Sequence, residues 1–169
     1  MTRRSTLLIG YGNPAHGDDG LGPVFDEHMA ERRFEGLPVQ ADSQLNADHA
    51  LDMAQHGCVV FADALLTGEA PFEFAEIIDP KPESLGSHSV SPSAALALCS
   101  LLFNAEPRTF VLGIRGEKFG DIAEGLSTTA ITNLGQAEVF FERWYTSIDD
   151  GTYIASPTGS TDLGVPDCL

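Results

Sequence analysis

Basic residues are scarce in this chain of 169 residues, which has 9 lysines and arginines against 25 aspartates and glutamates. The formal net charge at pH 7 is therefore −16. Nucleic acids and anionic membranes attract proteins through positive surface, so this balance disfavours both as partners. A cation, or a basic protein surface, suits the chain better.

Cysteines are also few, and long hydrophobic runs are missing. Cys58, Cys99 and Cys168 are odd in number and far apart, which is typical of neither a disulfide framework nor a zinc site. No stretch approaches the roughly 20 apolar residues of a membrane helix. The apolar run that follows Arg3 and Arg4 is too short for a signal peptide. We therefore expect a cytoplasmic protein that does not act on a membrane.

The length and the patterning predict one domain at residues 1–148, followed by a flexible tail at residues 149–169. The tail contains Gly, Ser, Thr and Pro without periodicity, and no basic residue. Within the domain, strands are expected near 7–9, 39–41, 58–62, 71–78 and 108–114. Helices are expected at 24–33, from about 46 to 57, after a Ser91 cap to 103, and from 128 to about 148 after a Ser127 cap.

The strand patterns define the fold class. The apolar run CVVFA at 58–62 is typical of a strand buried on both faces of a parallel sheet. The segment PFEFAEII at 71–78 alternates apolar and acidic residues and follows after a connection too short for a crossover helix, which predicts an antiparallel edge strand. We predict a three-layer α/β/α fold around a mostly parallel twisted sheet of about five strands.

The stretch TLLIGYGNPAHGDDGLG at residues 6–22 predicts a strand, a tight loop and the start of a helix. Such loops lie at the carboxyl edge of the sheet, where α/β proteins bind ligands. The spacing of Gly12 and Gly17 matches a P-loop, but Asp18 and Asp19 stand where a P-loop needs Lys and then Ser or Thr. These acids repel phosphate and attract cations. Alternatively, one of them only caps the helix, which has a single cap position and so leaves the other acid for a site.

Asp63 is a further candidate for the same edge, and His88 is a histidine in a later loop. Asp63 follows the 58–62 strand, and the apolar residues after it do not look like a polar turn, which favours a site role over turn formation. If the strands are parallel neighbours, Asp63 lies on the edge that carries Asp19. His88 precedes the helix that starts after Ser91, and a single loop histidine is ordinarily solvated.

Four segments together resemble the hydrogenase maturation proteases, endopeptidases that remove a C-terminal extension from the large subunit of nickel-iron hydrogenases. They are GYGNPAHGDDGLG, VVFADA, SHSVSPSAALAL and LGIRG, in order within residues 6–147. The segment QLNADHALDM also looks like that of a subgroup in which Gln-Leu follows the second strand. The resemblance implies a hydrogenase large-subunit precursor as the partner.

The resemblance also implies that Asp19, Asp63 and His88 are the catalytic and nickel-recognising residues. Such a protease has no serine or cysteine nucleophile and no cofactor of its own, because the nickel is carried by the substrate. Other divalent ions are expected to occupy the site in vitro. Two carboxylates and an imidazole suit a borderline divalent ion, which can polarise a carbonyl or activate water.

Two alternatives to this interpretation remain open. The same three side chains fit a metallohydrolase with its own zinc and an open position for water. They also fit a nickel-dependent checkpoint that binds the precursor without cleaving it. A serine hydrolase is a poor match, because the chain has no G-x-S-x-G elbow.

Overall fold

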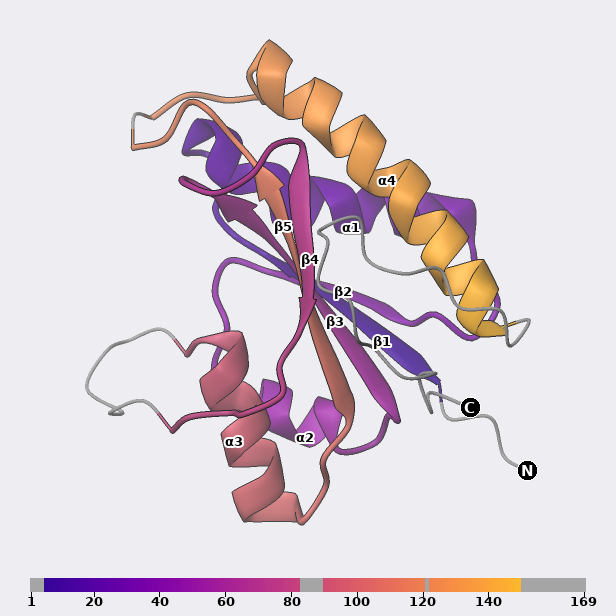
Figure 1. Cartoon of the computed structure of the whole chain (residues 1–169). Helices are drawn as coiled ribbons and strands as arrows, with labels where there is room; N and C mark the ends of the chain where they lie inside the picture. The colour runs from indigo at the N-terminus through magenta and orange to yellow at the C-terminus, as the bar shows by residue number, and fades with distance from the viewer. Residues whose placement is uncertain (1–4, 83–89, 121, 150–169) are drawn as a thin grey trace.

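A computed structural model describes residues 5–82, 90–120 and 122–149. One sheet lies between two layers of helices, with α1 and α4 on one face and α2 and α3 on the other (Figure 1). The strands are β1 Thr6–Tyr11, β2 Val39–Asp42, β3 Cys58–Leu65, β4 Phe72–Glu76 and β5 Arg108–Arg115. The helices are the 3-10 helix η1 Gly17–Gly20, α1 Leu21–Arg32, α2 His49–Met53, α3 Pro92–Phe103 and α4 Thr128–Asp149. The predicted α/β/α class is confirmed.

In the described part of the chain the strand order is β2-β1-β3-β5-β4, and only β4 runs antiparallel to its neighbour. The predicted antiparallel edge strand is thus confirmed. It pairs with β5 rather than with β3, which precedes it in sequence. β3 is hydrogen-bonded to β1 on one side and to β5 on the other. Its first five residues are fully buried, as the run CVVFA predicts.

The two predicted serine caps are confirmed. Ser91 Oγ accepts a hydrogen bond from the Ala94 N–H at 3.1 Å, and Ser127 Oγ accepts one from the Ala130 N–H at 3.1 Å. α1 begins at Leu21 instead of Val24, and its N-cap is Gly20. Neither acid of the first loop therefore caps α1 through its side chain.

The inner face of α4 carries Leu134, Phe141, Trp144 and Tyr145, which are all buried, whereas Val139 is 49% exposed. Residues at 134, 141, 144 and 145 share one face at 3.6 residues per turn, whereas position 139 points to the opposite side. Among the described residues, no helix combines the length and the apolar character needed to cross a bilayer.

Close backbone contact brings the start of α1 onto the ends of β1 and β3. A Cβ atom on Gly22 would lie 2.4 Å from the Tyr11 carbonyl oxygen and 2.6 Å from that of Ala62. Only glycine permits this approach. The loop between β1 and α1, which contains Asp19, is thereby held over the carboxyl edge of the sheet.

Asp26 is an acid in the buried face of α1. It is 1% exposed, its Oδ2 accepts a hydrogen bond from the Gly10 N–H, and its Oδ1 has no hydrogen-bond partner among the described residues. Burial raises the pKa of this carboxyl to about 8, although the Gly10 hydrogen bond acts in the opposite direction. The native protein therefore keeps a proton that the unfolded chain releases near pH 4.

This difference predicts a pH-dependent stability. A raised carboxyl pKa contributes stability that is present below about pH 4 and is lost as the pH rises to about 8, at up to about 1.4 kcal/mol per pH unit. Asp26→Asn is expected to remove this component of the slope. Urea unfolding of both proteins across this pH range measures it, with Glu31→Gln on the exposed side of α1 as the control that keeps the wild-type slope. Parallel slopes for Asp26→Asn and wild type would contradict the assignment.

Candidate active site

Asp63 lies inside β3, not after it. Ala64 and Leu65 continue the parallel pairing with β5, opposite Ile114 and Arg115. This corrects the predicted end of the strand, because backbone pairing with β5 extends β3 beyond its apolar run. Asp63 still lies at the carboxyl edge, since neighbouring β1 ends at Tyr11. Its side chain is partly exposed there.

Both oxygens of the Asp63 carboxylate are held by donors. The Tyr11 hydroxyl donates a hydrogen bond to Oδ2 at 2.7 Å, and the Ala64 N–H donates one to Oδ1 at 2.7 Å. The Tyr11 ring packs edge-on against Phe61, with ring centroids 6.4 Å apart. Each carboxylate oxygen has two lone pairs, so one on each remains for a further ligand.

Tyr11 was not predicted as a site residue. Two features of the sequence point to it: Tyr11 ends the first strand in the period-two series with Leu7 and Ile9, and Asp63 ends a matching series with Phe61. The register that places them side by side pairs Gly10 with Ala62, one residue earlier on each strand. That register is set by the tertiary structure.

Asp19 lies in η1, where the loop folds back on the end of β1. Its Oδ2 accepts a hydrogen bond from the Asn13 N–H at 2.8 Å. Gly12 has a φ of +142°, and a Cβ atom there would lie 2.0 Å from the Asp19 carbonyl oxygen. The glycine is therefore required for the turn that places Asp19. The side chain is partly exposed.

The charge of Asp19 acts on the pKa of Asp63 and on that of the Tyr11 hydroxyl. Burial raises the pKa of Asp63, the hydrogen bonds from Tyr11 and Ala64 lower it, and the charge of Asp19 raises it further. Burial, and then the charges of Asp63 and Asp19, raise the pKa of Tyr11, so its hydroxyl remains a donor at neutral pH. The structure thus brings Asp19 and Asp63 together at one edge, with a neutral donor beside them, an arrangement that attracts a cation.

Solved structures of known proteases have the same fold. The [NiFe] hydrogenase maturation protease HycI from Thermococcus kodakarensis KOD1 has a TM-score of 0.62 at 19% identity, over 83% of this chain and 92% of that one. The hydrogenase maturating endopeptidase HybD from E. coli has a TM-score of 0.62 at 20% identity, over 92% of this chain and 99% of that one. The chain has the fold of the hydrogenase maturation proteases. No family model and no curated protein matches it.

A third structure of this kind extends the likeness. An endopeptidase from Escherichia coli, solved in solution, has a TM-score of 0.65 at 17% identity, over 92% of this chain and 99% of that one. At these identities the likeness establishes the maturation-protease fold and nothing about individual side chains. His88 and nearly all of the predicted tail lie outside the described residues.

Within this fold, Asp18 has a different position from Asp19. It is fully buried, and its carboxylate accepts hydrogen bonds from four donors. These are the backbone N–H groups of Glu117 and Lys118 at 2.8 Å, and the N–H and hydroxyl of Ser127 at 2.7 Å. Burial alone would raise the pKa of Asp18, but these hydrogen bonds outweigh it and lower the pKa. Asp18 therefore fastens the β5–α4 loop to the first loop.

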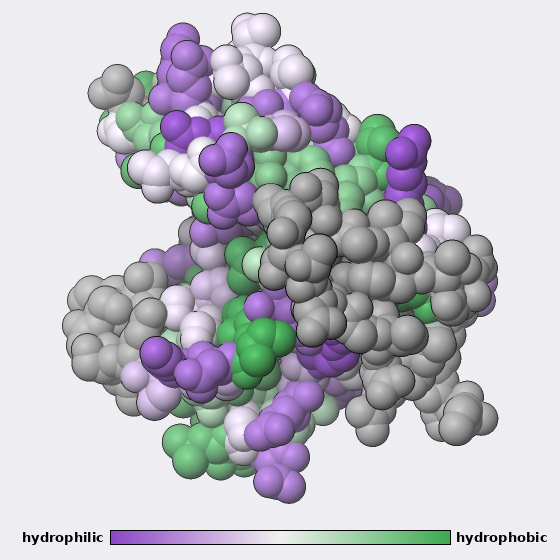
Figure 2. Space-filling model, viewed as in Figure 1, coloured by the Kyte–Doolittle hydropathy of each residue, from purple (hydrophilic) through white to green (hydrophobic). Residues whose placement is uncertain are grey.

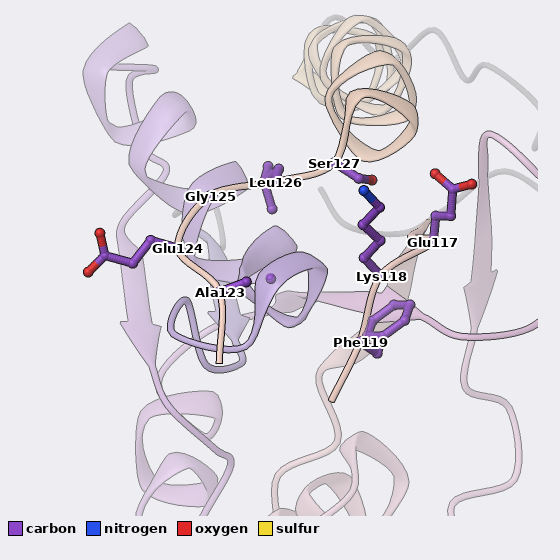
Figure 3. Close-up of a pocket in the computed structure, with 9 residues that line it drawn as sticks. Glu117, Lys118, Phe119, Ala123, Glu124, Gly125, Leu126 and Ser127 are labelled. Carbon is purple, nitrogen blue, oxygen red and sulfur yellow. The ribbon is translucent and has the colours of Figure 1, made fainter. Parts of the chain in front are cut away.

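The β5–α4 loop, residues 116–127, lies beside η1. It forms a hollow of about 660 Å³ beside η1, and Figure 3 shows Lys118 extending towards Ser127 at the start of α4. Glu124 points away from this hollow (Figure 3). Neither Asp19 nor Asp63 lines it.

The surface is also recessed at the carboxyl edge of the sheet. Figure 2 shows this recess between the β5–α4 loop and α3, with many hydrophilic residues around it. In the described ranges, no group of three or more His, Cys, Asp or Glu side chains is placed to hold a metal ion. Asp19 and Asp63 are thus two acids without a third such ligand in this part of the chain.

Proposed function

We propose that this protein is an endopeptidase that removes the C-terminal extension from the large-subunit precursor of a nickel-iron hydrogenase after nickel insertion. One observation carries the proposal. Two oriented carboxylates, Asp19 and Asp63, lie together at the carboxyl edge of a sheet whose fold is shared with the hydrogenase maturation proteases.

The proposed role of the two acids follows from their hydrogen bonds. Each carboxylate is held by at least one donor and retains lone pairs for a cation. Carboxylate oxygens and imidazole suit a borderline divalent ion such as nickel. We assign the imidazole to His88, which lies outside the described residues. The nickel belongs to the precursor, and the protein supplies the groups that recognise it.

Recognition of nickel would also place the scissile peptide. A precursor seated through its nickel at Asp19 and Asp63 brings the adjoining peptide to the same edge of the sheet. Fixing two reacting groups in this way is worth several kcal/mol of a reaction barrier. The nickel ion then offers Lewis acidity towards the carbonyl or the attacking water. A precursor without nickel lacks the cation that the two acids attract.

The intact mass of a nickel-loaded precursor, before and after incubation with the protein, tests this function. We expect loss of a C-terminal peptide from the loaded precursor and no change in a nickel-free sample. Cleavage of both samples by protein that retains zinc would instead indicate a metallohydrolase. A stable complex with the loaded precursor and no change in mass would indicate a binding checkpoint.

A further inference from the structure

Asp63 depends on Tyr11 for its only hydrogen bond, within the described residues, to another element of the fold. The bond from Ala64 comes from the next residue in the same strand, and it leaves the carboxylate attached to β3 alone. The bond from the Tyr11 hydroxyl, at 2.7 Å, connects the carboxylate to β1. Together the two bonds define the plane of the carboxylate, which would otherwise rotate about its terminal torsion.

Tyr11 is itself held firmly enough to fix the orientation of the Asp63 side chain. Its backbone pairs with Asp42 of β2, and the pairing continues one residue further, where the Gly12 N–H donates to the Asp42 carbonyl at 3.1 Å. Its ring rests edge-on against Phe61 of β3. The hydroxyl is therefore fixed by rigid elements on both sides, the condition for a preorganised binding group.

The nearby charge of Asp19 increases the effect of the Tyr11 hydrogen bond on the orientation of Asp63. Asp63 and Asp19 are both close enough to Tyr11 for their charges to act on it. Without the donor, the partly buried Asp63 carboxylate would face the charge of Asp19 with one hydrogen bond fewer. Like charges repel, and a hydrogen bond to a charged group is stronger than one between neutral groups. The carboxylate would then turn away or lose its defined orientation.

We propose that Tyr11 is a positioning residue for substrate recognition, which holds Asp63 in the orientation that contacts the nickel-bearing precursor. This inference rests on the proposed function, because it assigns Tyr11 a role through Asp63. Tyr11 does not itself contact the nickel. Its effect is on the difference in affinity between nickel-loaded and nickel-free precursors.

Tyr11→Phe tests the inference, because it keeps the ring against Phe61 and removes only the donor. We expect KM for the nickel-loaded precursor to rise about tenfold, which corresponds to about 1.4 kcal/mol. The nickel-free precursor, used as a competitive inhibitor, should keep its wild-type Ki. The ratio of Ki to KM should therefore fall about tenfold. A loss of general structure would raise KM and Ki together and leave the ratio unchanged, which would overturn the inference.

Tyr145→Phe is the matched control. It also removes one tyrosine hydroxyl donor, which bonds the Glu35 carbonyl at 2.8 Å in the layer of α1 and α4. We expect it to leave both KM and Ki unchanged. Thermal unfolding of both variants separates a loss of stability from a loss of recognition.

Asp63→Asn in the same assay separates this inference from the proposed function. If Asp63→Asn keeps the wild-type ratio of Ki to KM, nickel recognition through Asp63 is wrong, and the role of Tyr11 is wrong with it. If the ratio of Ki to KM falls in Asp63→Asn but stays at the wild-type value in Tyr11→Phe, only the role of Tyr11 is wrong. If the ratio falls in both single variants, the double variant should have the same ratio as Asp63→Asn alone, because the two residues act as one unit.

Discussion

Asp63→Asn and Asp19→Asn are each expected to lower kcat/KM for the nickel-loaded precursor by roughly 100- to 1,000-fold, the loss typical of removing one preorganised electrostatic contact. Asparagine keeps the shape of the side chain and one oxygen that can accept the hydrogen bond from Tyr11 or Asn13. It removes the negative charge that attracts the cation. Initial rates of peptide release, followed by mass spectrometry, provide the measurement.

Asp48→Asn is the matched control for this pair. Asp48 is an exposed acid before α2 whose side chain makes no capping hydrogen bond, so the substitution changes the net charge by the same amount without touching the two acids. Its processing rate should equal that of the wild type. Wild-type rates for Asp63→Asn or Asp19→Asn would remove that residue from the proposed site.

Asp18→Ala is expected to lower the free energy of unfolding by roughly 3 to 5 kcal/mol, because it leaves several buried donors without an acceptor. The donors come from Glu117, Lys118 and Ser127, so the β5–α4 loop would lose its attachment to η1. Urea unfolding at neutral pH measures the loss. Asp19→Asn should be close to wild type in the same experiment, because its side chain is partly exposed.

The pH dependence of the wild type provides a second test of Asp18. Since the pKa of Asp18 is lowered in the native state, its stabilisation is present above about pH 4, and it is lost as the pH falls through the native pKa. Asp18→Ala should lose stability at neutral pH and should differ less from the wild type in acid. A variant with full stability but no processing would show that Asp18 acts in the reaction instead.

Asp18 and Asp19 show how far a sequence can go in defining a site. The sequence predicts that two acids follow a glycine-rich turn and that at most one of them serves as a helix cap. It does not reveal that Asp18 binds the start of α4, where Ser127 donates two hydrogen bonds to its carboxylate. The partners of Asp18 are 99 to 109 positions away in the chain, beyond the reach of any local pattern.

Asp63 and Tyr11 show the same limit for a pair across two strands. The apolar run before Asp63 correctly predicts a buried central strand and a carboxylate near its end. The length of the strand depends on β5, which pairs with β3 as far as Arg115. The hydroxyl that orients Asp63 comes from a residue 52 positions earlier, brought alongside by the register of β1 and β3.

The sequence by itself determined the fold class, the five strands, the serine caps of α3 and α4, and the presence of acids at the carboxyl edge of the sheet. These follow from local causes: period-two and period-3.6 apolar patterns, turn residues and cap chemistry within a few positions. Tertiary structure alone decided that Asp18 is buried and hydrogen-bonded to the β5–α4 loop, that Tyr11 orients Asp63, and that Asp26 keeps its proton. Burial and hydrogen-bond partners depend on which segments pack together, and that packing joins residues too far apart for any local pattern to relate them.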